Sequence, residues 1–165
     1  MWDKKRTEIS PEGRTIDLRD LVGSPGVLPT DEGAGRVLIV DDDVALRMLM
    51  LRILRRSGYT SLTATSTGEA RELMKSERFG VLVTDLRMFA EDGIELVRHA
   101  KDNYPDVFSI VVTGFADDEM EDRVQRAGAY ALLRKPFEAP ELAALVERAF
   151  EQRTEAVALS RHRSM

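Results

Sequence analysis

The sequence predicts a doubly wound α/β fold, because five short apolar runs alternate with five stretches of helical pattern between residues 36 and 153. Strands that alternate with helices form a parallel sheet, since right-handed crossovers place the helices on both faces. A second observation is that four of the runs end in acidic, hydroxyl or amine side chains. Ligands of such sheets bind at the carboxyl ends of the strands, so the pattern also predicts where a site lies.

The boundaries of the predicted elements follow from cap and turn residues. Asp43 can cap the first helix, which Ser57 and Gly58 end, and Thr67 is the expected N-cap of the second helix. The central strand is apolar on both faces, which is typical of a buried parallel strand. The expected strands are 36–40, 59–64, 80–84, 107–112 and 129–133, and the expected helices are 43–56, 67–77, 93–102, 117–126 and 138–153.

Length and composition limit the classes of protein. A chain of 165 residues has room for one domain of ordinary size, and the absence of cysteine excludes disulfides and thiolate metal sites. No apolar stretch approaches the roughly 20 residues that span a bilayer, and the first ten residues have no apolar run of the kind that signal peptides carry. We therefore expect a cytoplasmic protein without membrane contact. The net charge of −5, with both signs interspersed, argues against a nucleic-acid partner.

Two terminal segments flank the predicted domain at 35–153. Residues 1–34 are polar and rich in glycine and proline, which predicts a flexible extension. Within it, 15–22 could form one or two helical turns, and both loose packing on the domain and a docking role are open. Residues 154–165 are expected to form a short tail that neither folds alone nor binds DNA. We expect no output domain in this chain, although it could be a fragment of a longer protein.

The polar residues at the strand ends suggest one shared site. The carboxyl ends of parallel strands meet at one edge of the sheet, so these side chains are expected to converge there. Each feature alone has an ordinary structural explanation. The acidic run can be a helix cap, the lysine before Pro136 can mark a corner between a strand and a helix, and the threonine can belong to a turn. Their joint occurrence at successive strand ends indicates a site. These residues are Asp41, Asp42, Asp85, Thr113 and Lys135.

The residue types in this set point to phosphoryl chemistry. Carboxylates that lie close together repel one another, and a hard cation such as Mg²⁺ resolves the repulsion with oxygen ligands. A lysine and a hydroxyl beside Mg²⁺ are the groups that neutralise and orient a phosphoryl oxygen. Asp85, on the central strand, can then act as a nucleophile that forms an aspartyl-phosphate.

Four motifs show that the chain resembles the CheY-like receiver domain of bacterial two-component response regulators over residues 36–152. The resemblance implies a flavodoxin-like (βα)5 fold with a five-stranded parallel sheet in the order 2-1-3-4-5. It also implies that the phosphodonor is a histidine kinase or a histidine phosphotransfer protein. Signalling is then expected to proceed through protein contacts, and the resemblance allows a homodimer. The motifs are LIVDDD (38–43), TDLRMFAEDGIEL (84–96), VVTG (111–114) and GAYALLRKPF (128–137).

The resemblance assigns roles to the site residues. It makes Asp85 the phosphorylated residue and, with Lys135 and the switch threonine, a member of the catalytic set. The implied Mg²⁺ ligands are Asp42, Asp85 and the backbone carbonyl of Arg87, with Asp41 reaching the metal through water. The chain would therefore be a phospho-acceptor signalling domain rather than an enzyme that acts on a separate substrate.

Signal output is expected to differ from the family pattern. Thr113 matches the switch hydroxyl, and Pro136 matches the proline that commonly follows a cis peptide bond. Leu132 stands where the family usually has a tyrosine or phenylalanine that moves with the threonine, and Phe89 replaces a loop proline. We therefore expect a damped change at 117–133, with Phe115 as the moving ring and loop 86–93 carrying part of the signal.

The first helix has more apolar residues than one core-facing stripe needs. The predicted core stripe is Leu46, Leu49, Met50, Ile53 and Leu54. A surplus apolar patch commonly marks a partner site, and the resemblance places phosphodonor docking on this helix. A wider core face under the N-terminal extension is the alternative. The surplus residues are Val44, Met48 and Leu51.

Two other functions are weighed against the phospho-acceptor. A receiver whose phosphorylation is unused would act as an interaction scaffold, and Leu132 and Phe89 favour this reading. A phosphatase with an aspartyl nucleophile usually has a second acid two residues beyond the nucleophile, where this chain has Arg87. The intact acidic, hydroxyl and amine set favours phosphoryl acceptance over both.

Overall fold

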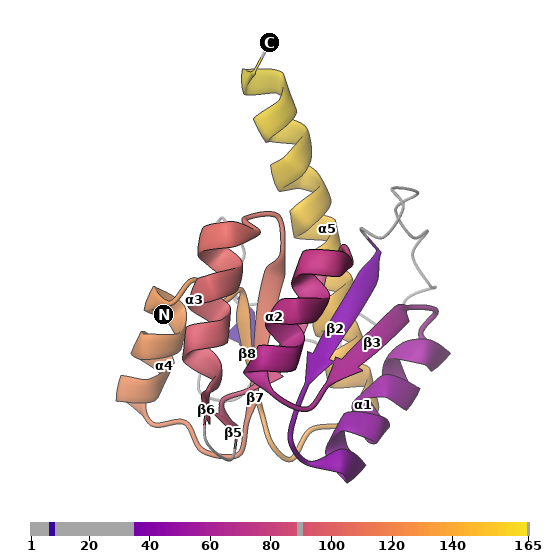
Figure 1. The fold of residues 1–165 in the computed structure, drawn as a ribbon, viewed down its shortest axis with the longest axis vertical. Helices are drawn as coiled ribbons and strands as arrows, with labels where there is room; N and C mark the ends of the chain where they lie inside the picture. The colour runs from indigo at the N-terminus through magenta and orange to yellow at the C-terminus, as the bar shows by residue number, and fades with distance from the viewer. Residues whose placement is uncertain (1–6, 9–34, 89–90, 165) are drawn as a thin grey trace.

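A computed structural model describes residues 7–8, 35–88 and 91–164. Its main sheet has the order β1-β8-β7-β4-β2-β3, and β1 is its antiparallel member (Figure 1). Counted along the chain, the parallel strands follow the order 2-1-3-4-5, which confirms the predicted flavodoxin-like fold. These strands are β2 (Arg36–Val40), β3 (Thr60–Ala64), β4 (Val81–Asp85), β7 (Phe108–Thr113) and β8 (Ala131–Arg134).

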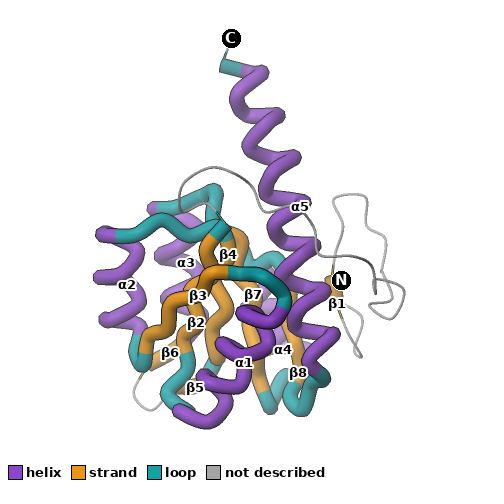
Figure 2. The backbone as a smooth tube through the Cα atoms, turned by 90° about the vertical axis from the view of Figure 1, so that its right-hand side faces the viewer, coloured by secondary structure: helices purple, strands orange, loops and turns teal. Residues whose placement is uncertain are grey.

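Helices cover both faces of the sheet (Figure 2). The first and last helices pack on one face, and the other three pack on the opposite face. Asp43 caps the first helix by accepting a hydrogen bond from the Leu46 amide. The second helix is capped by Ser66 rather than the predicted Thr67, because Ser66 has an extended backbone and its hydroxyl accepts from the Glu69 amide. The helices are α1 (Val44–Arg56), α2 (Thr67–Ser76), α3 (Gly93–Asn103), α4 (Asp118–Arg126) and α5 (Ala139–Arg163).

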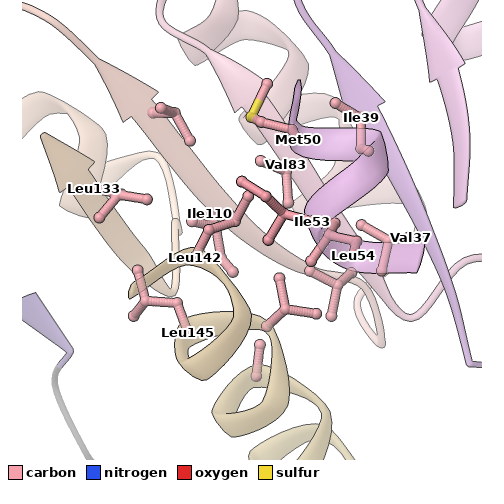
Figure 3. Close-up of a cluster of buried hydrophobic side chains, with 14 of the residues drawn as sticks. Val37, Ile39, Met50, Ile53, Leu54, Val83, Ile110, Leu133, Leu142 and Leu145 are labelled. Atoms are coloured by element: carbon pink, nitrogen blue, oxygen red, sulfur yellow. The ribbon is translucent and has the colours of Figure 1, made fainter. Parts of the chain in front are cut away.

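The core lies on both faces of the central strands. Successive residues of a strand point to opposite faces, so Ile39 packs towards α1 and α5 while Leu38 packs towards α2 and α3. Figure 3 shows Met50 and Leu54 of α1 and Leu142 of α5 in one buried cluster over the sheet. Full burial of each such side chain is worth about 1.5–3 kcal/mol. This packing fixes the strand ends that carry the polar residues.

The last helix is longer than predicted. The sequence predicts its end near residue 153 and a tail at 154–165, but α5 continues to Arg163. The added segment has no glycine or proline to stop the helix, and the Arg153 Nε donates to the Asp106 carbonyl at 2.8 Å. Buried residues of α5 end at Phe150, and the helix then projects from the domain (Figure 1).

Two segments predicted as irregular contain short strands. After Asp85, β5 (Arg87–Met88) and β6 (Glu91–Asp92) form an antiparallel pair. In the predicted N-terminal extension, β1 (Thr7–Glu8) pairs with β8 at the edge of the sheet. Phe89, between β5 and β6, lies outside the described residues. So does the rest of the N-terminal extension, including 15–22. Among the helices of the described ranges, none combines the length and the apolar character needed to cross a bilayer.

Candidate functional site

The acidic pair begins where β2 ends. Asp41 is fully buried, and its Oδ1 accepts a hydrogen bond from the Asp43 amide at 2.8 Å. Arg47, one turn into α1, donates to the backbone carbonyl of Asp41 at 2.7 Å and fixes the direction of the strand end. The second carboxylate oxygen, Oδ2, is buried without a hydrogen-bond partner. Asp42, by contrast, is exposed.

Asp85 is the last residue of β4 and is buried. Its Oδ1 accepts from the Leu86 amide at 2.8 Å. The start of α3 folds back against this strand end, where the Gly93 amide donates to the Leu86 carbonyl at 2.9 Å. A Cβ on Gly93 would lie 2.1 Å from the Asp85 carbonyl oxygen, so only glycine allows this close approach.

The three carboxylates form one cluster. One oxygen from each of Asp41, Asp42 and Asp85 lies within 4.8 Å of the others. Burial raises the pKa of Asp41 and of Asp85, because an ionised carboxylate loses hydration there. The Oδ2 of Asp41, which has no hydrogen-bond partner, and the all-oxygen donor set fit a hard cation such as Mg²⁺.

Lys135 provides the positive charge of the cluster in this structure. Its Nζ lies 3.4 Å from Asp85 Oδ1 and 3.7 Å from Asp41 Oδ2. Its backbone amide donates to the Thr113 carbonyl at 2.8 Å, which ties the ends of β7 and β8 together. The peptide bond between Lys135 and Pro136 is cis, as the resemblance implies.

The Thr113 hydroxyl is turned towards its own loop. It donates to the Phe115 carbonyl at 3.0 Å and accepts from the Phe115 amide at 3.3 Å. The Phe115 ring is 54 % exposed, and the Arg87 guanidinium lies 4.9 Å from its centroid. Leu132 is not part of the acidic site: it is buried against Val124 of α4.

The structure corrects the predicted apolar faces of α1. Val44, Met48 and Leu49 are 62 %, 48 % and 46 % exposed, whereas Leu51 is only 8 % exposed. Leu49 is therefore not a core residue, and Leu51 is not part of an open surface. Leu51 joins the core because it faces the sheet and α5. The apolar run from 48 to 51 does not itself show which of its residues face the core. Packing against distant parts of the chain decides this.

Two residues that shape the site were not predicted from the sequence. Arg47 is buried although it is an arginine in a solvent-facing pattern, and Gly93 is needed at the start of α3. The glycine could have been suspected, because it follows an acidic residue at a predicted helix start. No local signal indicates the contact between Arg47 and the Asp41 carbonyl.

Comparison with known families agrees with this geometry. The model of the response regulator receiver domain matches residues 37–147. The chain belongs to this family. A receiver domain protein (CheY-like) from Methanospirillum hungatei superposes with a TM-score of 0.71 at 30 % identity, over 73 % of this chain and 97 % of that one. The beryllofluoride-activated NtrC4 receiver dimer gives 0.69 at 34 % identity, over 72 % and 98 %.

The receiver domain is also found within longer regulators. The transcriptional regulator NtrC of Escherichia coli K12 is 36 % identical over 115 residues, which are 70 % of this chain and 24 % of NtrC. The chain thus spans about a quarter of the length of that regulator. Within the receiver domain, the cluster of Asp41, Asp42 and Asp85 is an acidic site typical of receiver Mg²⁺ binding.

Proposed function

We propose that this receiver domain accepts a phosphoryl group on Asp85 from the phosphohistidine of a histidine kinase or a histidine phosphotransfer protein. The observation that carries the proposal is the Asp85 carboxylate with Lys135 at 3.4 Å and two further carboxylates beside it. An Asp85 oxygen forms the new bond to phosphorus as the bond between phosphorus and the histidine nitrogen breaks. The electron pair of that bond stays on the imidazole.

The neighbouring residues have distinct tasks in this step. Asp42, Asp85 and the Arg87 carbonyl, with Asp41 through water, would hold Mg²⁺, which supplies positive charge to the phosphoryl oxygens. The Lys135 amine is close enough to neutralise a second phosphoryl oxygen. The Thr113 hydroxyl would leave the Phe115 carbonyl and donate to the phosphoryl group.

The exposed face of α1 is where we place the phosphodonor. Val44 and Met48 follow the acidic pair along α1, and both are exposed. A groove of about 430 Å³ extends from Met48 along α1, and three arginines line it. An apolar surface next to the acceptor suits a helix that must bring a phosphohistidine close to Asp85. The groove is lined by Met48, Leu51, Arg52, Arg55 and Arg56.

We also propose that the domain acts by itself in the cytoplasm, through protein contacts. The M. hungatei receiver domain protein is an analogy for a receiver that occurs without an output domain. The NtrC4 receiver dimer supports, by analogy, a homodimer as one such contact. A scaffold that does not use phosphorylation is the second candidate, and the observation that favours it is Leu132 in place of a mobile ring.

Acetyl phosphate labelling tests the proposal. With Mg²⁺, intact-mass measurement should show one added phosphoryl group, and removal of Mg²⁺ by EDTA should abolish it, because Asp41 and Asp42 would then repel the phosphate. Asp85→Asn should show no labelling. The control Asp106→Asn changes an exposed acid near the C-terminal end of α3 and should label normally. Normal labelling of Asp85→Asn would refute Asp85 as the acceptor.

A further inference from the structure

The loop that follows Thr113 is held at its far end by a side chain from β8. Arg134 Nη1 donates to the Ala116 carbonyl at 2.7 Å, and the same guanidinium forms an ion pair with Glu121 of α4. A planar guanidinium can make both contacts at once, which a lysine amine cannot do with the same geometry. We call Arg134, the Ala116 carbonyl and the Glu121 carboxylate the loop latch.

The loop latch is shielded from water. The Glu121 side chain is 10 % exposed and that of Arg134 is 32 % exposed. Ion pairs in full contact with solvent contribute little, but a charge that is mostly removed from water requires its partner. Ion pairs on the surface, such as Arg98 with Glu95 on α3, are far more exposed. The latch is therefore a stronger restraint than those surface pairs.

We propose that Arg134 is a positioning residue that fixes α4 and the α4 end of the Thr113 loop, so that phosphorylation moves the side of the loop next to Arg87 instead. This inference rests on the proposed function, because it assigns the direction in which that site signals. Arg134 and Leu132 are two residues apart in β8 and face the same side. Leu132 meets α4 through apolar packing alone, and Arg134 supplies the polar contact to the same helix.

The geometry explains why the two ends of the loop respond differently. To reach a phosphoryl oxygen, the Thr113 hydroxyl must give up the Phe115 carbonyl. The next carbonyl, that of Ala116, is held by Arg134 with a charge-assisted hydrogen bond. The Phe115 ring is largely exposed, and it contacts the exposed Arg87 on β5. The contact between Phe115 and Arg87 is the weaker restraint, so it should yield first. Because Arg87 lies two residues beyond the acceptor Asp85, the movement would occur next to the phosphorylation site.

The first arm of the test needs no phosphodonor. Arg134→Met combined with Glu121→Gln removes the loop latch without leaving a buried charge alone. Amide exchange over 114–126 should become about ten-fold faster, since one charge-assisted hydrogen bond biases a local equilibrium by that order. Arg134→Lys should fall between this variant and the wild type. The control pair Arg98→Met with Glu95→Gln should exchange over 114–126 as the wild type does.

The second arm uses Mg²⁺ and beryllofluoride as a phosphoryl mimic. In the wild type, exchange should change at 86–93 and 113–115 and little at 117–126. In the latch variant, the response at 117–126 should become several-fold larger. Wild-type exchange over 114–126 in the latch variant, or an unchanged response of α4 to beryllofluoride, would overturn the proposal. A wild-type protein that binds no mimic and takes no label would refute the phospho-acceptor function, while the first arm still decides whether the latch exists.

Discussion

At the residue scale, the site is built from carboxylates that the fold holds out of water. Burial raises the pKa of both Asp41 and Asp85, and Lys135 opposes that rise from 3.7 Å and 3.4 Å, respectively. One lysine cannot balance three acids, so the fold maintains local repulsion that a cation or an incoming phosphoryl group with Mg²⁺ relieves. The reactivity that we propose for Asp85 would thus follow from where β2 and β4 end.

The free energy of unfolding without Mg²⁺ should depend on pH through this cluster. Above the ordinary carboxyl pKa of 3.8, the folded protein holds protons that the unfolded chain has released. Stability therefore falls as pH rises through the raised pKa values of the folded state. Asp85→Asn removes one charge and should raise the melting temperature at pH 7 by about 2–4 °C.

Thermal unfolding followed by circular dichroism in EDTA from pH 4.5 to 7.5 measures this effect. The gain of Asp85→Asn should shrink towards the acidic end, because the raised pKa of each buried carboxyl increases the protonated fraction there. Added Mg²⁺ should stabilise the wild type more than the variant, because the variant has lost a ligand. A melting temperature at pH 7 that is lower for the variant than for the wild type would contradict the argument.

At the element scale, the apolar residues of α1 form both part of the core and an exposed apolar surface. Its inner side packs on the sheet and α5 through residues such as Leu51 and Leu54. Its outer side leaves Val44, Met48 and Leu49 exposed. Exposed apolar surface of this kind commonly marks a partner site, and it starts beside Asp42, which is why we propose it for the phosphodonor.

Met48→Glu should slow phosphoryl transfer from the protein donor about ten-fold or more, because it puts a charge in the middle of the apolar surface. Labelling by acetyl phosphate should stay unchanged, since the small donor needs no docking. Both rates can be followed by intact-mass measurement. Leu51→Glu is not a useful test, because Leu51 is buried and the charge would disturb the core.

A matched control is Leu159→Glu, which places the same charge on another exposed residue, far along α5. It should leave transfer from both donors at the wild-type rate. If Met48→Glu and Leu159→Glu transferred equally fast from the protein donor, α1 would not be the docking surface.

At the scale of the whole molecule, both the core and the candidate site lie within residues 36–150. The last buried residue of α5 is Phe150, and beyond it the helix is attached by the hydrogen bond from Arg153 to the Asp106 carbonyl. A pocket of about 560 Å³ opens between this part of α5 and the C-terminal ends of α2 and α3, on the side of the sheet remote from Asp85. The projecting part of α5 therefore contributes to the surface rather than to the fold.

Truncation of the chain after Arg153 should leave both fold and labelling intact. The urea midpoint should change by no more than the amount that exposed helix residues contribute, about 0.5 kcal/mol in the free energy of unfolding. Acetyl phosphate should label Asp85 at the wild-type rate. A truncated chain that fails to fold would show that α5 beyond Phe150 is part of the core.

The sequence alone determined the sheet and the edge at which the polar groups meet. Alternation of strands and helices dictates parallel strands, and parallel strands place Asp41, Asp85, Thr113 and Lys135 at one edge without knowledge of any contact. That prediction used only local patterns and chirality, which are properties of short segments. The order of the strands came from the resemblance, and the structure confirms it.

The tertiary structure decided what short segments leave open. Whether Leu49 or Leu51 enters the core depends on α5, which lies about ninety residues away in the sequence. Arg47 and Arg134 acquire their roles from a carbonyl at a strand end and from a carboxylate on α4. Such contacts join groups whose separation in space is set by packing, and no sequence period encodes them.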